Sequence, residues 1–69
     1  MKLSTRNQLP GSVTAVITGE AIAVVKIALD RGAEITSAIT KDAAQDLGLV
    51  EGTRVLALIK STEVALAVD

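Results

Sequence analysis

The sequence predicts an all-β domain with one short helix, built from five strands, and three observations support this prediction. The chain has 69 residues, so it forms one small domain at most, residues 1–69, because so short a chain buries only roughly 60% of its unfolded surface. Short apolar segments rich in β-branched residues alternate with breaks that contain glycine or proline. A single segment, after Thr40, changes to the apolar spacing of a helix.

The first three predicted strands span residues 12–18, 21–30 and 34–39. The first two are rich in β-branched residues, and Gly19-Glu20 between them predicts a hairpin turn. The third alternates polar and apolar residues after a turn at residues 30–32. Pro10-Gly11 is expected to be a break that precedes the first strand.

The rest of the chain predicts one helix and two more strands. Thr40 can cap a helix of about two turns, and Gly48 is expected to end it. Residues 53–60 and 63–68 alternate in the manner of strands. Three strands, a helix and two strands is the order of an OB-fold, a five-stranded Greek-key barrel with a helix between its third and fourth strands.

Two of the predicted strands have apolar residues on both faces. In residues 21–30 one face is suited to a core, yet the other face begins with Ile22 and Val24. In residues 53–60, Leu56 and Leu58 lie opposite a second apolar set. Because a half-buried antiparallel strand should have a polar outer face, we predict that another subunit covers these residues. The alternative is that twist in a small barrel changes which face is buried.

The composition argues against several classes of function. There is no cysteine, histidine or aromatic residue, and the chain contains seven basic and eight acidic residues. An enzyme is not expected, because the acid/base candidates are scattered; Asp42 and Asp46 fit a solvated helix face. Nucleic acid is not an expected partner, because an OB-fold binds it through aromatic platforms and a positive groove. Neither a directly ligated metal cation nor a catalytic cofactor is expected.

Location and membrane partners follow from hydropathy. No apolar run approaches the roughly 18 to 20 residues that span a bilayer, so no membrane association is expected. The first residues are polar and lack the apolar core of a signal peptide, which favours a cytoplasmic location.

The chemistry that remains is suited to an oxyanion. Residues 4–7 and 60–62 each join a cation to hydroxyl groups. Arg6 offers a planar fork of donors and Lys60 a point charge, which together would balance a tetrahedral dianion, while Ser4 and Ser61 could add hydroxyl hydrogen bonds. The backbone N–H groups of residues 41–43, after Thr40, form a third donor set. Each feature also has an ordinary interpretation: a solvated lysine, a helix cap and a frayed terminus.

Three segments resemble the molbindins, a family of small Mop-domain proteins. Residues 2–13 are similar to the family's opening S-x-R-N-x-L-x-G-x-V, and Ala38-Ile39-Thr40 with the helix that ends at residues 46–49 is similar to its middle. Residues 52–64 are similar to its G-x-x-V and I-K-[AS]-[TS] patterns. The resemblance implies an OB-like Mop domain and a homo-oligomer, a hexamer arranged as a trimer of dimers. It also implies molybdate or tungstate bound at subunit interfaces, for cytoplasmic molybdenum storage or homeostasis.

The resemblance also assigns individual residues to the oxyanion site. The main candidates share hydroxyl, cationic or backbone N–H donors: Ser4, Arg6, Thr40, Lys60, Ser61 and the backbone N–H of Ala43, where the family often has serine. Secondary candidates are Thr5, which stands where alanine is common, Asn7, assigned first to structure, and Thr62. The alternative function is a structural or regulatory oligomerisation domain that has no physiological oxyanion.

Overall fold

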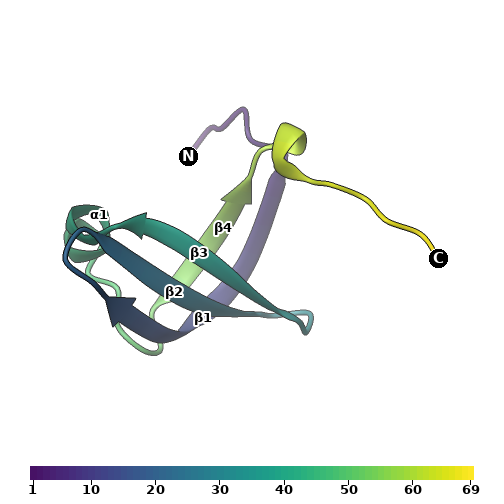
Figure 1. The fold of residues 1–69 in the computed structure, drawn as a ribbon. Coiled ribbons are helices and arrows are strands. Elements are labelled where there is room, and N and C mark those ends of the chain that lie inside the picture. The colour runs from purple at the N-terminus through teal and green to yellow at the C-terminus, as the bar shows by residue number, and fades with distance from the viewer.

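A computed structural model describes all 69 residues as a curled antiparallel sheet with one short helix (Figure 1). The strands are β1 (Asn7–Thr18), β2 (Ile22–Leu29), β3 (Glu34–Thr40) and β4 (Arg54–Ile59), and the helix is α1 (Lys41–Asp46). The sheet order is β3-β2-β1-β4, so β3 and β4 are its edges. The predicted mostly-β architecture with one helix is confirmed, with four strands in place of five.

The first strand is longer than the sequence predicts, because β1 continues through Pro10 and Gly11. Its first half pairs with β4, from Asn7↔Ile59 to Ser12↔Arg54, and its second half pairs with β2. The carbonyl oxygen of Pro10 accepts a hydrogen bond from the N–H of Asp30 (3.0 Å), just beyond the end of β2. Since a residue's N–H and C=O point to the same side of a strand, the proline removes no bond from the β1–β4 ladder. The predicted break at this position is wrong.

The core is formed chiefly by the paired strands β1 and β2. Val13, Val25 and Ile27 form the buried cluster, and Ala23 is fully buried beside them. The register of β1 against β2 shifts between Val13 and Ala15, a bulge that bends the strand. The predicted core face of the second strand is therefore confirmed from Ala23 to Ile27.

The helix forms as its capping residues predict. The hydroxyl oxygen of Thr40 accepts a hydrogen bond from the N–H of Ala43 (3.0 Å), and Ala44 is buried against the sheet. The N–H of Lys41 donates to the carbonyl of Ala21 (2.8 Å), which fixes the helix beside the β1–β2 turn. Gly48 adopts a φ of 64°, a left-handed conformation that ends the helix at little cost for glycine.

The fifth strand predicted over residues 63–68 does not form in the single chain. The chain leaves β4 through a 3-10 turn, η1 (Ser61–Glu63), and residues 64–69 then extend away from the sheet without a strand partner (Figure 1). Leu66 and Val68 are 93% and 98% exposed. The alternation of this segment is that of a strand, but a strand also needs a partner edge, and sequence periodicity does not state which edge is within reach.

The outer apolar faces predicted for β2 and β4 are present and largely uncovered. Ile22 is 48% exposed and Leu58 is 46% exposed. Leu56 is also exposed, whereas Val24 is half-buried. Twist of the sheet therefore accounts for Val24 and leaves the other three side chains open to a partner.

Candidate functional site

Pairing between β1 and β4 brings both predicted anion-binding segments to the same end of the sheet. The last pair of this ladder is Asn7↔Ile59, so the residues just outside it, Arg6 and Lys60, follow as neighbours in an antiparallel arrangement. Figure 1 shows the N-terminal segment and η1 side by side at this end. We call this group the terminal cluster; it comprises Ser4, Thr5, Arg6, Asn7, Lys60, Ser61 and Thr62.

Two side-chain hydrogen bonds hold the terminal cluster in place. The amide nitrogen Nδ2 of Asn7 donates to the carbonyl of Ile59 (3.0 Å), which ties the start of β1 to the end of β4. The Nε2 of Gln8 donates to the carbonyl of Thr5 (2.8 Å) and fixes the chain that precedes the strand. Asn7 thus has the structural role that the sequence predicts for it first. Its hydrogen bond joins the residue that follows Arg6 to the residue that precedes Lys60.

The terminal cluster carries two positive charges that no carboxylate neutralises. Arg6 and Lys60 are both exposed, and neither forms an ion pair; the ion pair of the chain joins Arg54 to Asp30 elsewhere. Ser4 and Ser61 are exposed as well, so their hydroxyl groups are accessible. A guanidinium, an ammonium and two hydroxyls provide the opposite charge and directed donors that replace the hydration of an oxyanion.

Thr40 and Ala43 lie at the opposite end of the sheet. The register Ile22↔Thr40, together with Thr18↔Ala23, places Thr40 near the C-terminal end of β1, whereas Arg6 precedes its N-terminal end. The two ends are the first and last of the 12 residues of β1. At about 3.3 Å for each step between residues, an extended chain of this length spans roughly 36 Å. One chain therefore carries two groups of predicted ligands that a single small anion cannot contact together.

The donors at the start of α1 are partly used within the chain. The N–H of Ala43 is bonded to the hydroxyl oxygen of Thr40, and the N–H of Lys41 is bonded to the carbonyl of Ala21. The sequence predicts that the backbone N–H groups of residues 41–43 are available to an anion. Two of these three groups already donate hydrogen bonds within the chain, so the prediction is wrong for those two. The hydroxyl of Thr40 accepts one bond in the cap and keeps its own proton to donate.

One residue near Thr40 was not among the predicted ligands. Lys41 begins α1 directly after Thr40, and its backbone N–H is bonded to the carbonyl of Ala21. Its position directly after Thr40 is the feature of the sequence that could have identified Lys41 as a candidate ligand. In the sequence, Lys41 is interpreted only as a residue of the first helical turn. The group at this end, which we call the helix-end group, consists of Thr40, Lys41 and Ala43.

The structure has no cluster of metal ligands, and its two hollows contain none of the predicted anion ligands. No three histidine, cysteine, aspartate or glutamate side chains gather to hold a metal ion. The main hollow, an open groove of about 630 Å³, is lined by 13 residues of which 11 are hydrophobic, and it contains none of the predicted anion ligands. None of the helices has the length and apolarity needed to cross a membrane.

Proteins that are similar to this chain in sequence and in fold are named for binding molybdenum-pterin or molybdate. Residues 3–66 match the family model of the TOBE domain. Molybdenum-pterin-binding protein 3 of Clostridium pasteurianum is 46% identical over 66 residues, which cover 96% of this chain and 97% of the relative. The residues matched by the family model, 3–66, span both the terminal cluster and the helix-end group.

Two solved structures have the same fold. A molybdate-binding protein from Sporomusa ovata superimposes with a TM-score of 0.91 at 39% identity, covering 97% of this chain and 98% of its own. The cytoplasmic molybdate-binding protein ModG, solved with molybdate bound, gives a TM-score of 0.95 at 45% identity and covers all of this chain but 49% of its own length. With the match to the TOBE domain and these relatives, the chain belongs to the molbindin, or Mop-domain, family.

Proposed function

We propose that this protein binds molybdate between the subunits of a homo-oligomer. The observation that carries the proposal is the separation of the terminal cluster from the helix-end group, at opposite ends of β1. Each is an incomplete shell for a tetrahedral anion, and each becomes complete if the terminal cluster of one chain meets the helix-end group of another. Molybdate is chosen as the anion because two structural neighbours are described as molybdate-binding proteins.

Each member of the proposed site has a distinct task. Arg6 donates two parallel hydrogen bonds from its guanidinium, and Lys60 adds a second positive charge, so the dianion is neutralised. Ser4 and Ser61 donate hydroxyl protons, and the hydroxyl of Thr40 donates from the second chain. Thr5, Thr62 and the backbone of Ala43 complete the wall of the site. Tungstate has the same charge and shape and is expected to bind in the same place.

We further propose a hexameric assembly, a trimer of dimers, with a role in cytoplasmic molybdenum storage or homeostasis. The exposed Ile22, Leu56 and Leu58 supply apolar surface for contacts between chains. One structural neighbour is described as cytoplasmic. The proposal involves no chemical transformation of the anion, and the residues of the site bind and release it without a general base.

Isothermal titration calorimetry with molybdate tests the proposal, supported by elemental analysis of the protein after loading and gel filtration. Arg6→Ala and Lys60→Ala are each expected to weaken binding by roughly 1.5–3 kcal/mol, the usual value of a hydrogen bond to a charged group. Arg31→Ala is the matched control, because Arg31 is an exposed cation in the β2–β3 turn and belongs to neither group. Parent-like affinity in the Arg6 and Lys60 variants, with the assembly intact, would show that the site is elsewhere.

A structural or regulatory oligomerisation domain is the second candidate function, because its outer apolar residues need no ligand to associate. Light scattering and elemental analysis on the same sample separate the two. A stable oligomer that retains neither molybdenum nor tungsten after reloading supports the second candidate. Bound anion in a ratio fixed to the number of chains supports the first.

A further inference from the structure

The charged side chains are unevenly distributed between the two ends of β1. Residues 1–6 and 60–63, at the terminal end, carry three cationic side chains and one carboxylate. Residues 19–21 and 40–48, at the helix end, carry three carboxylates and one cationic side chain. The groups in excess are Lys2, Arg6 and Lys60 at the terminal end and Glu20, Asp42 and Asp46 at the helix end. One end is therefore positive and the other is negative by the same amount.

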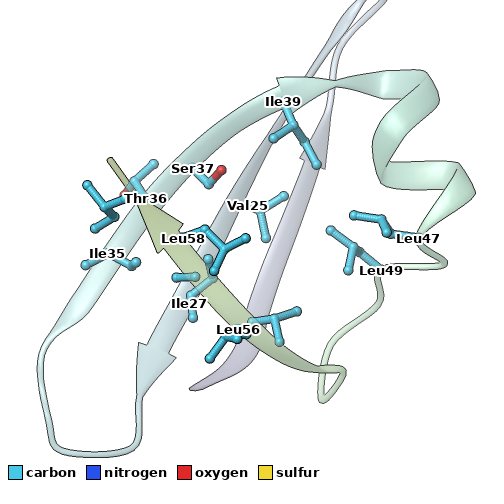
Figure 2. A pocket seen from close by; sticks show the side chains of 13 residues that line it. Val25, Ile27, Ile35, Thr36, Ser37, Ile39, Leu47, Leu49, Leu56 and Leu58 are labelled. Carbon is cyan, nitrogen blue, oxygen red and sulfur yellow. The ribbon is translucent and has the colours of Figure 1, made fainter. Parts of the chain in front are cut away.

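No contact within the chain neutralises this excess. The ion pair of the structure joins Arg54 to Asp30, and neither residue belongs to the two ends. The open groove that β3 and β4 flank (Figure 2) is lined by no charged side chain. An extended strand as long as β1 spans roughly 36 Å, several times the Debye length of about 8 Å at physiological ionic strength. Attraction between the two ends of one chain is therefore screened, and both ends keep their charge for a partner.

The partner that this charge distribution fits is a second copy of the chain. The terminal end of one copy and the helix end of another carry opposite charge, which favours contact between them before any anion is present. The proposed function brings the same two surfaces together around an oxyanion, so the present inference rests on it. What the charges add is an attraction between these surfaces in the absence of the ligand.

Asp42 is the carboxylate nearest in sequence to the anion ligands proposed for the helix end. It is exposed, forms no ion pair in the single chain and lies between Lys41 and Ala43 in the first turn of α1. Its Cα lies at most about 7 Å from that of Thr40, because only two residue steps separate them. A cation of another chain that shares an anion with Thr40 is therefore also close to Asp42.

We propose that Asp42 pairs with Arg6 or Lys60 of a neighbouring chain in the anion-free oligomer and is displaced when molybdate binds. Its carboxylate supplies the opposite charge and the acceptor oxygens that these cations lack in the single chain. Once the dianion is bound, the same carboxylate is a like charge beside it and lowers the affinity. Asp42 thus stabilises the oligomer without its ligand and makes the bound anion easier to release.

Isothermal titration calorimetry on Asp42→Asn tests the second half of this proposal. The substitution removes the charge and keeps the size of the side chain, so we expect the dissociation constant for molybdate to fall about 5-fold. Asp46→Asn is the matched control, because it removes the same charge from the same helix about 6 Å further along its axis. A change of less than about 2-fold is expected there. Damage to the helix would weaken binding, so a gain in affinity is not explained by a structural role of Asp42.

Light scattering over a dilution series tests the first half, in a low-salt chloride buffer that contains no oxyanion. We expect Asp42→Asn to raise the dissociation constant of the oligomer about 10-fold, and 0.5 M sodium chloride to remove most of the difference from the parent. Asp42→Glu keeps the charge and should resemble the parent. Asp42→Asn is also combined with Arg6→Ala and, separately, with Lys60→Ala. In at least one of the two double variants the effects on association should be less than additive, because both substitutions break the same pair.

Two results would overturn the proposal. The first is a molybdate affinity of Asp42→Asn equal to or below that of the parent, with a parent-like circular dichroism spectrum. The second is additivity in both double variants. If the parent binds molybdate through Arg6 while Asp42→Asn keeps the parent affinity, the proposed function stands and this inference fails. If the parent binds no molybdate, the proposed function fails, and the double variants still show whether Asp42 pairs with a cation of another chain.

Discussion

Gly11 sets the distance between β1 and β2. A Cβ at this position would lie 2.6 Å from the carbonyl oxygen of Ala28 and 3.0 Å from Cγ2 of Ile27. The nearer atom belongs to the backbone of the neighbouring strand, so it cannot move away without disturbing the ladder. Gly11→Ala is therefore expected to lower the free energy of unfolding by about 1–3 kcal/mol. Urea denaturation followed by circular dichroism measures this change.

The control for this substitution is its neighbour. Ser12→Ala removes a hydrogen bond from the guanidinium of Arg54 (2.9 Å) on the exposed side of the strand. A cost of about 1 kcal/mol or less is expected there. If Gly11→Ala were no more destabilising than Ser12→Ala, the close approach of the two strands would be wrong.

Ala33 stores backbone strain in the turn between β2 and β3. Its φ is 83°, in the left-handed region that disfavours a side chain, and the preceding Gly32 has a φ of 88°. Ala33→Gly is expected to raise the free energy of unfolding by up to about 1 kcal/mol, because glycine adopts this conformation without the Cβ penalty. The same substitution in the exposed part of β3, Ala38→Gly, is expected to lower it by roughly 0.5–1 kcal/mol. Thermal melts of the two variants should shift in opposite directions.

At the scale of elements, one ion pair and an adjoining hydrogen bond link β4 to residues of β1 and to the end of β2. The guanidinium of Arg54, at the start of β4, bonds both carboxylate oxygens of Asp30, beyond β2, at 2.7 and 2.6 Å, and it also reaches Ser12 of β1. These hydrogen bonds hold the pKa of the Asp30 carboxyl below its usual value of 3.8. The stabilisation is therefore complete above about pH 4 and is lost as the pH falls through the lowered pKa.

The acid dependence of this pair can be measured with Asp30→Asn. At pH 7 the melting temperature of the variant is expected to lie slightly below that of the parent, since an exposed ion pair contributes little. The two curves should converge as the pH falls through the lowered pKa, because the parent carboxyl becomes protonated and loses its charge. A difference in melting temperature that does not change between pH 7 and pH 2 would mean that the ion pair is not its source.

Local chemistry made most elements predictable, and long-range pairing made the rest unpredictable. The β1–β2 hairpin and the helix α1, capped by Thr40 and followed by Gly48, depend on residues that lie close to each other in the chain. Pro10 was misinterpreted because its place in a strand depends on β4, more than 40 residues away. The predicted fifth strand has the correct alternation, yet it pairs with neither of the two edge strands of its own chain, β3 and β4.

At the scale of the whole molecule, the same distinction governs the candidate site. The donor chemistry of Arg6 and Lys60 could be inferred from residue types, and β1–β4 pairing explains why they are neighbours. That Thr40 lies at the far end of the sheet could not be inferred, since it depends on the order of strands. A sequence motif therefore identifies candidate ligands, but it does not state how many chains supply them. The structure adds that the candidate ligands of one chain lie in two separate groups.

An anion held between chains links binding to assembly and to thermal stability. A ligand that binds only the folded oligomer stabilises it by RT ln(1 + [L]/Kd), about 2.7 kcal/mol when its concentration is 100 times Kd. For a domain of this size each kcal/mol raises the melting temperature by roughly 4–8 °C. We therefore expect molybdate at 100 times Kd to raise the melting temperature by roughly 10–20 °C in differential scanning calorimetry.

Two variations separate this linkage from a general salt effect. Sodium chloride at matched ionic strength should leave the melting temperature nearly unchanged, and Arg6→Ala should lose most of the shift with molybdate while Arg31→Ala retains it.

The melting temperature should also rise with protein concentration, because unfolding of an oligomer is coupled to its dissociation. A shift with molybdate at a melting temperature independent of protein concentration would place the whole site in one chain. That outcome would contradict a site shared between subunits, since the terminal cluster would then bind the anion without Thr40.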